Sequence, residues 1–372
     1  MRTILFLLQK EFRQIKRNKT ILPIIFVMPI MQLLILVHAT TFEIKNVNLC
    51  VVDYDMTNTS QRLVHKLEGS SFFKVKSTQF SVSEAEKQLA NNSVDMIIVI
   101  PQHFSSNLIK QKHATVQCIP NAINSNFATL AYAYAASVII DFNKNIVSET
   151  ISSITPRPVK TVNTNVRFWF NPELNYKWYM FPGIMVILIS MIGIFIAGLN
   201  LVREKEMGTN EQLNVTPMKK HHFIIGKLLP FLIIGLFELL FAILIGRIAY
   251  NVPLVGNIWV LIAYTFVYLL VVLGIGLFIS TMADTQQQMM FIAYFAIIVF
   301  ILLSGIFTPT ESMPVWVQKF NVINPLSSYM RVIRMVMLKG SGFANLIPEL
   351  ISLSIYAVLI NALATWRYRK TV

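Results

Sequence analysis

Residues 203–217 read Arg-Glu-Lys-Glu-Met-Gly-Thr-Asn-Glu-Gln-Leu-Asn-Val-Thr-Pro, a polar stretch between two long apolar runs. The runs cover about residues 179–202 and 223–249, and each is long enough to cross about 30 Å of hydrocarbon as a helix. The stretch is therefore a loop between two predicted membrane spans. Since a loop needs no acidic side chains to fix its orientation, we interpret this one as a docking element for a partner protein.

The polar loop carries its own helix signals. Thr209 can cap a short helix, and Gln212, three residues later, completes a capping box. Gly208 permits a turn in front of this helix, and Pro217 ends it. The pattern predicts a short helix over about residues 209–216 that lies across the membrane face. The acidic residues near its start are Glu204, Glu206 and Glu211.

The rest of the chain shares the apolar character of the two runs. Of its 372 residues, 55% are hydrophobic and 13% are charged, whereas soluble proteins carry about 25% charged residues. Further apolar runs cover about residues 21–42, 258–281, 287–308 and 345–366. The sequence therefore predicts an α-helical membrane protein with six transmembrane helices.

The distribution of basic residues predicts the orientation of these spans. The chain has 32 Lys and Arg against 18 Asp and Glu, and many of the basic residues lie in an amphipathic arm over residues 1–20, in the polar loop and in the C-terminal tail. Basic residues that flank spans favour the cytoplasmic side and anionic lipid headgroups. We expect a multi-pass protein of the cytoplasmic (inner) membrane with both termini cytoplasmic and with membrane lipids as contacts. The net charge of +14 then needs no nucleic-acid partner.

Residues 43–171 have the composition of a soluble domain. Apolar strands over 47–53 and 96–100 alternate with predicted helices, one of which, over 83–90, begins with a Ser83/Glu86 capping box. This alternation predicts an inserted α/β domain with a mainly parallel sheet, placed outside the cytoplasm.

Cys50 and Cys118 are the two cysteines of the chain, and both fall in the predicted outer domain. A disulfide is permitted there, although a pair of free thiols is the favoured interpretation. The sequence has no Cys-x-x-Cys motif and no Cys/His cluster. It therefore offers no support for a metal site, and we expect no cofactor.

A segment over about residues 309–340 separates the last two predicted spans and is broken by prolines and a glycine. Arg331 and Arg334 lie three residues apart, so they share a face of a helix. We interpret the segment as short amphipathic or re-entrant helices at the outer leaflet, from which the two guanidinium groups reach the interface. An external loop without a buried portion is the alternative.

Polar and small residues inside the predicted spans are the remaining candidates. Glu238 is an acidic residue within the run 223–249, where an isolated carboxylate costs several kcal/mol, about 3 on insertion scales. It could contact a cation at a dimer seam, but a structural hydrogen bond to a neighbouring helix is favoured. The pairs Gly193/Ala197 and Gly276/Ser280 permit close helix approach, with packing inside one chain as the default.

Several short motifs follow one another in the second half of the chain. They are Arg203-Glu204-x-Glu206-x-Gly208-Thr209-x-Glu211-Gln212-Leu213-x-Val215-Thr216-Pro217, Gly226-Lys227-Leu228-Leu229-Pro230, Ser280-Thr281-Met282-Ala283-x-Thr285-Gln286-Gln287-Gln288, Leu303-Ser304-Gly305, Glu311-Ser312-Met313-Pro314 and Asn324-Pro325-Leu326. Through their order and spacing, residues 172–372 resemble the membrane subunit of ABC-2 type transporters. The resemblance is to bacterial exporter permeases that carry a large domain between spans one and two.

This resemblance implies that the polar loop is a coupling helix that inserts into an ATPase subunit. The residues it marks for coupling are Arg203, Glu204, Glu206, Gly208, Thr209, Glu211, Gln212, Leu213, Thr216 and Pro217. The chain has no Gly-x-x-x-x-Gly-Lys-Ser/Thr phosphate loop, so ATP must bind a separate ATP-binding-cassette chain. We therefore expect a transport subunit without catalytic residues of its own.

The resemblance also implies how the transporter is assembled and what it carries. The chain would pair with a second copy or a sister permease and export amphipathic drugs or lipid-like compounds. Its outer domain could contact a periplasmic adaptor protein. Two other classes stay open: a membrane-anchored receptor whose outer domain binds a ligand, and an ion-coupled secondary transporter in which Glu238 takes part. Association with an ATPase separates the permease from both.

Overall fold

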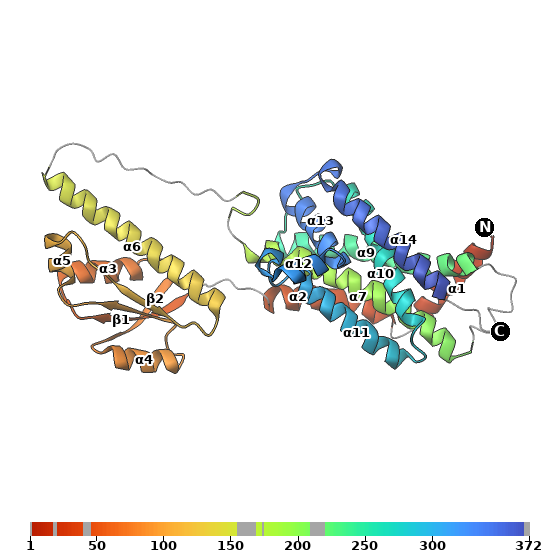
Figure 1. Cartoon of the computed structure of the whole chain (residues 1–372), viewed down its shortest axis with the longest axis horizontal. Helices are drawn as coiled ribbons and strands as arrows, with labels where there is room; N and C mark the ends of the chain where they lie inside the picture. The colour runs from red at the N-terminus through yellow and green to blue at the C-terminus, as the bar shows by residue number, and fades with distance from the viewer. Residues whose placement is uncertain are drawn as a thin grey trace. The chain divides into compact units, whose positions relative to one another are not determined.

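The computed structural model describes residues 2–17, 21–39, 46–154, 169–172, 175–208 and 220–367 (Figure 1). The chain divides into two compact units. One unit combines Met1–Thr41 with Arg167–Val372, and the other is Phe42–Val166. The larger unit is a helix bundle, and the smaller one contains the sheet.

The helix bundle contains five helices that are long and apolar enough to cross a membrane, counted over the described residues. They are Tyr176–Glu206, Gly226–Tyr250, Ile258–Ser280, Gln286–Leu303 and Phe343–Arg367. The first predicted span, over about residues 21–42, corresponds to helix α2 (Ile21–Ala39), whose apolar part Ile25–Ala39 is shorter than a full crossing. The predicted helical membrane architecture is therefore present. The described residues contain five helices of this kind, whereas the sequence predicted six.

Two of these helices, α7 (Tyr176–Glu206) and α10 (Ile258–Ser280), pack closely in the middle of the bundle. A Cβ atom on Gly276 would lie 2.5 Å from the carbonyl oxygen of Ile194, and one on Gly193 would lie 2.5 Å from a methyl group of Val272. The glycines therefore let the two backbones approach. The prediction that these small residues serve packing inside one chain is confirmed.

The remaining helices surround this pair. Helix α9 (Lys220–Tyr250) contacts α7 and α10, and α14 (Ile347–Arg367) packs along α10. Helix α11 (Gln286–Leu303) contacts α7. Most side chains of α11 and α14 are not buried by the rest of this chain. In a membrane protein such apolar faces meet lipid or another subunit.

The segment between α11 and α14 consists of short helices, in line with the broken pattern of its sequence. They are η1 (Thr310–Ser312), α12 (Val315–Asn321), α13 (Pro325–Lys339) and η2 (Phe343–Leu346). Asn324 caps α13 by accepting a hydrogen bond from the backbone N–H of Leu326, and its side-chain amide donates to the carbonyl of Phe300 at 2.8 Å. This contact fastens the start of α13 to the end of α11.

The smaller unit contains a four-stranded sheet in the order β2-β1-β3-β4. The strands are β1 (Val47–Asp53), β2 (Phe73–Gln79), β3 (Met96–Ile100) and β4 (Gln117–Pro120). Strand β1 pairs in parallel with β2 and β3, whereas β4 runs antiparallel to β3. The sheet is therefore mixed, with its parallel pairs in the majority.

Helices cover both faces of this sheet. On one face, α3 (Asn58–Glu68), α5 (Phe104–Lys110) and α6 (Ser125–Ile154) contribute Leu63, Phe104 and Ala131 to the larger core. On the other face, α4 (Val82–Ala90) contributes Ala85 to a smaller core. Burial of the strands on both faces explains their continuous apolar runs.

Two expectations for this unit concern particular side chains. The capping box predicted at Ser83/Glu86 is wrong, because α4 begins one residue earlier and Ser83 lies inside it; Ser81 is the N-cap and makes no side-chain cap bond. A capping box is present instead between Thr57 and Ser60 at the start of α3. Cys50 and Cys118 are both free thiols, as the sequence favoured.

Candidate functional site

The N-terminal helix α1 (Arg2–Arg17) is fastened to the helix bundle along one of its faces. Leu7, Glu11 and Ile15 recur every four residues, and all three are buried. Leu7 packs where α9 has Gly226, since a Cβ atom on that glycine would lie 2.9 Å from a methyl group of Leu7. The missing side chain thus makes room for α1 on α9.

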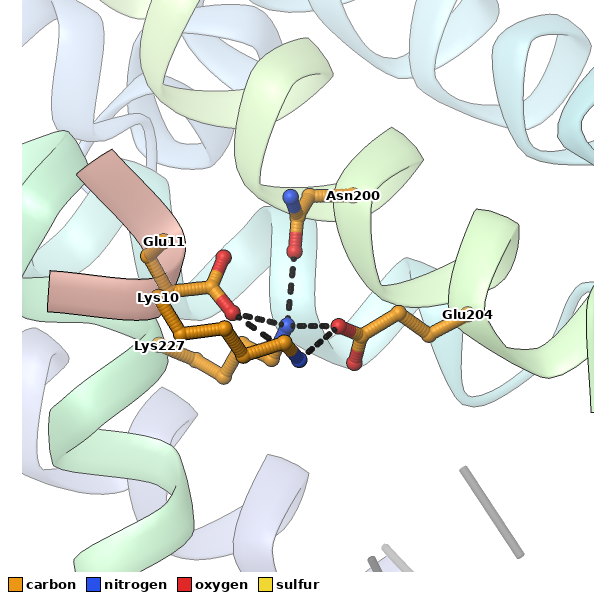
Figure 2. A network of polar contacts seen from close by, with 5 residues as sticks. All are labelled: Lys10, Glu11, Asn200, Glu204 and Lys227. Carbon is orange, nitrogen blue, oxygen red and sulfur yellow. Dashed lines mark hydrogen bonds and ion pairs between the residues drawn. The ribbon is translucent and has the colours of Figure 1, made fainter. Parts of the chain in front are cut away.

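Glu11 enters a network of charges that joins three helices (Figure 2). Lys227 of α9 places its ammonium nitrogen 2.7 Å from Glu11 Oε1 and 2.6 Å from Glu204 Oε1 of α7, and donates to Asn200 Oδ1 at 3.0 Å. Lys10 donates to the same oxygen of Glu204 at 2.7 Å. Two carboxylates and two ammonium groups therefore balance one another. We call these five residues, Lys10, Glu11, Asn200, Glu204 and Lys227, the polar cluster.

The polar cluster is buried in the chain. Glu11, Glu204 and Lys227 are 0%, 1% and 2% exposed, and Lys10 lies at the edge. Burial alone would lower the pKa of the Lys10 ammonium, but the hydrogen bond and charge of Glu204 outweigh it, so the pKa is raised. A buried charge is tolerated only when it is paired and hydrogen-bonded, and removing one partner typically costs about 3–5 kcal/mol.

The cluster lies at both ends of the polar loop. Glu204 is in the last turn of α7, and Lys227 follows the first turns of α9. Gly208, the last described residue before residue 209, adopts a φ of +68°, as expected for a glycine that turns the chain out of a helix. Because Glu204 and Lys227 are paired, both ends of the loop are fastened to each other and to α1.

A second set of contacts fixes the end of α7 to the turn between α10 and α11. Lys205 forms an ion pair with Asp284 and donates to the carbonyl of Ala283 at 3.2 Å. Glu206 accepts hydrogen bonds from the backbone and the side chain of Gln286. The hydrogen bond and charge of Lys205 lower the pKa of the Asp284 carboxyl. The polar end of α7 is thus attached to α1, to α9 and to this turn.

A model of the ABC-2 family of transporter proteins matches residues 19–366 of the chain. The chain belongs to this family. It is 29% identical over 371 residues to the probable multidrug ABC transporter permease YbhR of Escherichia coli, with 98% of each chain covered. It is 24% identical to the probable multidrug permease YbhS, over 97% of this chain and 95% of that one, and 24% identical to the inner membrane transport permease YhhJ, over 100% and 98%.

This membership identifies the chain as a membrane permease of the ABC transporter class. The structure describes some of the residues that the sequence predicts for coupling. Arg203 is half-buried, and Glu206 and Gly208 lie at the end of α7. Residues 209–219, with Thr209, Glu211, Gln212, Leu213, Thr216 and Pro217, lie outside the described residues.

One expectation for the polar loop is corrected by the geometry. The sequence placed Glu204 near the start of a docking helix, but Glu204 is inside α7 and turned into the polar cluster. Its periodicity explains the difference, because it continues the buried face of α7 through Asn200. The sequence did not reveal that Lys10 and Lys227 pair with Glu204, or that Glu11 shares Lys227 with it. The available signal was a Glu between Leu7 and Ile15 on the buried face of α1.

Glu238 lies within α9 and is 1% exposed, so its carboxylate is enclosed by this chain. Neither of its oxygens has a hydrogen-bond partner among the described residues. The favoured structural hydrogen bond is therefore absent there. Because burying an unpaired carboxylate costs free energy, Glu238 does not stabilise the fold through contacts with the described residues.

Arg331 and Arg334 differ more than their shared spacing suggested. Arg334 is half-buried, lies 3.8 Å from the ring centroid of Tyr179 and donates to the carbonyl of Gly305 at 3.2 Å. Arg331 is exposed and 3.9 Å from Glu349. Arg334 therefore binds aromatic and carbonyl groups of its own chain, whereas Arg331 stays exposed. That the two guanidinium groups reach the membrane interface stays a prediction.

An apolar groove of about 640 Å³ lies between α2, α7 and α11. Its wall includes Met28 and Gln32 of α2, Phe195 of α7, and Phe291 and Tyr294 of α11. Methionine and aromatic side chains adapt to differently shaped apolar ligands, and the glutamine offers a polar contact. The wall of the groove is therefore mostly apolar, with a few polar groups.

Proposed function

We propose that this chain is the permease subunit of an ATP-binding-cassette exporter and that the loop 209–216 couples it to separate ATPase subunits. The observation that carries the proposal is the pairing of Glu204 with Lys227, because it fastens both ends of the loop to the helix bundle. A loop that receives force from a partner transmits it only if its ends are held stiffly. Glu11 and Lys10 extend this support to α1.

The ATPase is a separate chain in this proposal. The sequence lacks a phosphate loop, and the bacterial relatives that match over nearly their whole length are named as permeases. The groups offered to the ATPase are the residues of the loop itself, among them Thr209, Glu211 and Leu213. Arg203, Glu206 and the buried Glu204 support the loop from α7.

The proposal includes a membrane topology for the chain. Six spans place α1, the coupling loop and the C-terminus in the cytoplasm, with α2 as the first span of an inner-membrane protein. The unit Phe42–Val166 then lies outside the cytoplasm, where it could pass cargo to a periplasmic adaptor. The basic residues of α1 and of the C-terminal tail support this orientation.

A second copy or a sister permease completes the pathway. The groove between α2, α7 and α11 supports an amphipathic drug or a lipid-like compound as cargo, since its lining is apolar apart from Gln32, Gln287 and the hydroxyl group of Tyr294. The names of YbhR and YbhS, which call both probable multidrug permeases, point to the same class of cargo.

The test is co-purification of the full chain with its partners from membranes in a mild detergent. Wild type is compared with Glu211→Lys/Leu213→Asp, and a matched control carries Glu84→Lys/Ile109→Asp at two exposed positions of the smaller unit. We expect wild type and control to retain an ATP-binding-cassette ATPase with ATP hydrolysis, and the loop variant to lose both. A chain that purifies without an ATPase in all three forms is instead a receptor or an ion-coupled transporter.

A further inference from the structure

A cationic pocket of about 570 Å³ lies between α1 and the end of α7. It is lined by Phe6, Gln9, Lys10, Arg13, Gln14, Arg17 and Arg203. The six residues of α1 are spaced three and four apart, so they form one stripe along the helix. This stripe lies beside the buried face of Leu7, Glu11 and Ile15, which holds α1 in place.

Three of the four cations in this pocket are available for a ligand. Lys10 is engaged by Glu204, but no ion pair of Arg13, Arg17 or Arg203 is found within the described part of the chain. Three guanidinium groups offer N–H donors in a rigid, planar arrangement, and two side-chain amides offer further N–H donors. Such donors match the oxygens of a phosphate group, which arginine binds in a bidentate manner.

The position of the pocket indicates which phosphate it takes. Arg203 is in the last turn of α7, at the level where this membrane helix becomes polar, and so at the depth of lipid headgroups. Phe6 is 70% exposed at one end of the stripe, and Phe12 of the same helix is 39% exposed. An amphipathic helix with basic and aromatic residues lies in the membrane interface and is attracted to anionic lipids.

We propose that this pocket binds the phosphate headgroup of an anionic phospholipid. Arg13, Arg17 and Arg203 hold the phosphate, Gln9 and Gln14 donate further hydrogen bonds, and Phe6 contacts the glycerol and upper acyl chain. Because Lys10 belongs both to the pocket and to the polar cluster, a bound lipid lies next to the group that supports Glu204. The lipid site stands on the geometry of α1 and α7 and needs no assumption about the cargo or the ATPase.

The test measures binding of a fluorescently labelled phosphatidylglycerol to the full chain purified in dodecyl maltoside, with labelled phosphatidylcholine as the neutral probe. The variant Arg13→Gln/Arg17→Gln removes two pocket cations. The matched control, Lys16→Gln/Arg367→Gln, removes the same charge from two exposed residues that do not line the pocket. All three proteins are first checked by size-exclusion chromatography, and Arg17→Gln alone replaces the double variant if that one does not fold.

We expect wild type and control to prefer phosphatidylglycerol, and the pocket variant to bind it about tenfold more weakly or worse while phosphatidylcholine binding stays unchanged. Equal binding by wild type and pocket variant would overturn the proposal. An equal loss in the control would do so too, because it would mean that net charge and not the pocket attracts the lipid. Displacement of the lipid by low-millimolar inorganic phosphate would assign the pocket to a soluble anion instead.

Discussion

Glu204 Oε1 lies 2.6 Å from Lys227 Nζ, and these two residues stand on opposite sides of the polar loop that joins α7 to α9. Their contact therefore closes the loop at its base. Lys10 and Glu11 bind the same pair from α1, so a helix far away in the sequence shares in holding the loop. The proposed coupling function depends on this closure.

The first prediction concerns this pair. Glu204→Gln leaves the buried ammonium group of Lys227 and the partly exposed one of Lys10 with a single carboxylate, that of Glu11. It should lower the free energy of unfolding by on the order of 3 kcal/mol. Adding Lys227→Met restores the charge balance and should return part of that loss. Thermal unfolding of the two single variants and the double variant measures the coupling. Strictly additive effects would contradict a direct interaction.

Glu238 should behave in the opposite way from Glu11, although both are buried glutamates. Glu11 is paired with Lys227, whereas the carboxylate of Glu238 has no hydrogen-bond partner in the described ranges. We expect Glu11→Leu to lower the melting temperature strongly and Glu238→Leu to leave it unchanged or raise it, since an unpaired carboxylate gives way to an apolar group. Similar losses in both variants would refute this assignment.

The contact between α7 and α10 gives a steric prediction. In Gly276→Ala the new methyl group meets the backbone of Ile194, so we expect overpacking to cost about 1–3 kcal/mol. Gly342→Ala is the control, because nothing lies within 4 Å of the added carbon and its φ of −83° suits alanine. Both are compared by thermal unfolding in the same detergent. A control that is as unstable as Gly276→Ala would rule out the close approach as the cause.

Arg334 and Arg331 supply a matched pair on α13. Arg334→Gln loses a cation–π contact with Tyr179 and a hydrogen bond to Gly305, so about 1–2 kcal/mol of stability should be lost. Arg331→Gln breaks only a long surface ion pair and should change stability by less than about 0.5 kcal/mol. Chemical unfolding of the two variants distinguishes them, and equal effects would show that the contacts of Arg334 with Tyr179 and Gly305 add no stability.

Much of the fold was predictable because its signals are local. Long apolar runs marked the membrane helices, and the apolar strands around Val47 and Met96 marked the sheet. The antiparallel β4 and the mixed sheet were less accessible, since strand direction depends on contacts between distant segments. The shifted start of α4 shows how a single residue decides whether Ser81 or Ser83 is the N-cap.

The site was harder to predict than the fold. The sequence marked Glu204 as a charged loop residue, and only the packing of α7 against α9 reveals that it is a buried partner of Lys227. Likewise, Arg331 and Arg334 share a spacing, but the position of Tyr179 on α7 decides which of them is covered. Such pairs join residues that are far apart in the chain, so the periodicity of a single helix cannot predict them.

The most direct test of the coupling function is photo-crosslinking from the loop in intact membranes. A photoreactive amino acid replaces Glu211 in the full chain, and the control carries it at Ile109, which is 75% exposed in the smaller unit. The account predicts a crosslink from position 211 to an ATP-binding-cassette ATPase and none from position 109. A loop that crosslinks only to lipid or to its own chain, with the ATPase present in the same membranes, would contradict it.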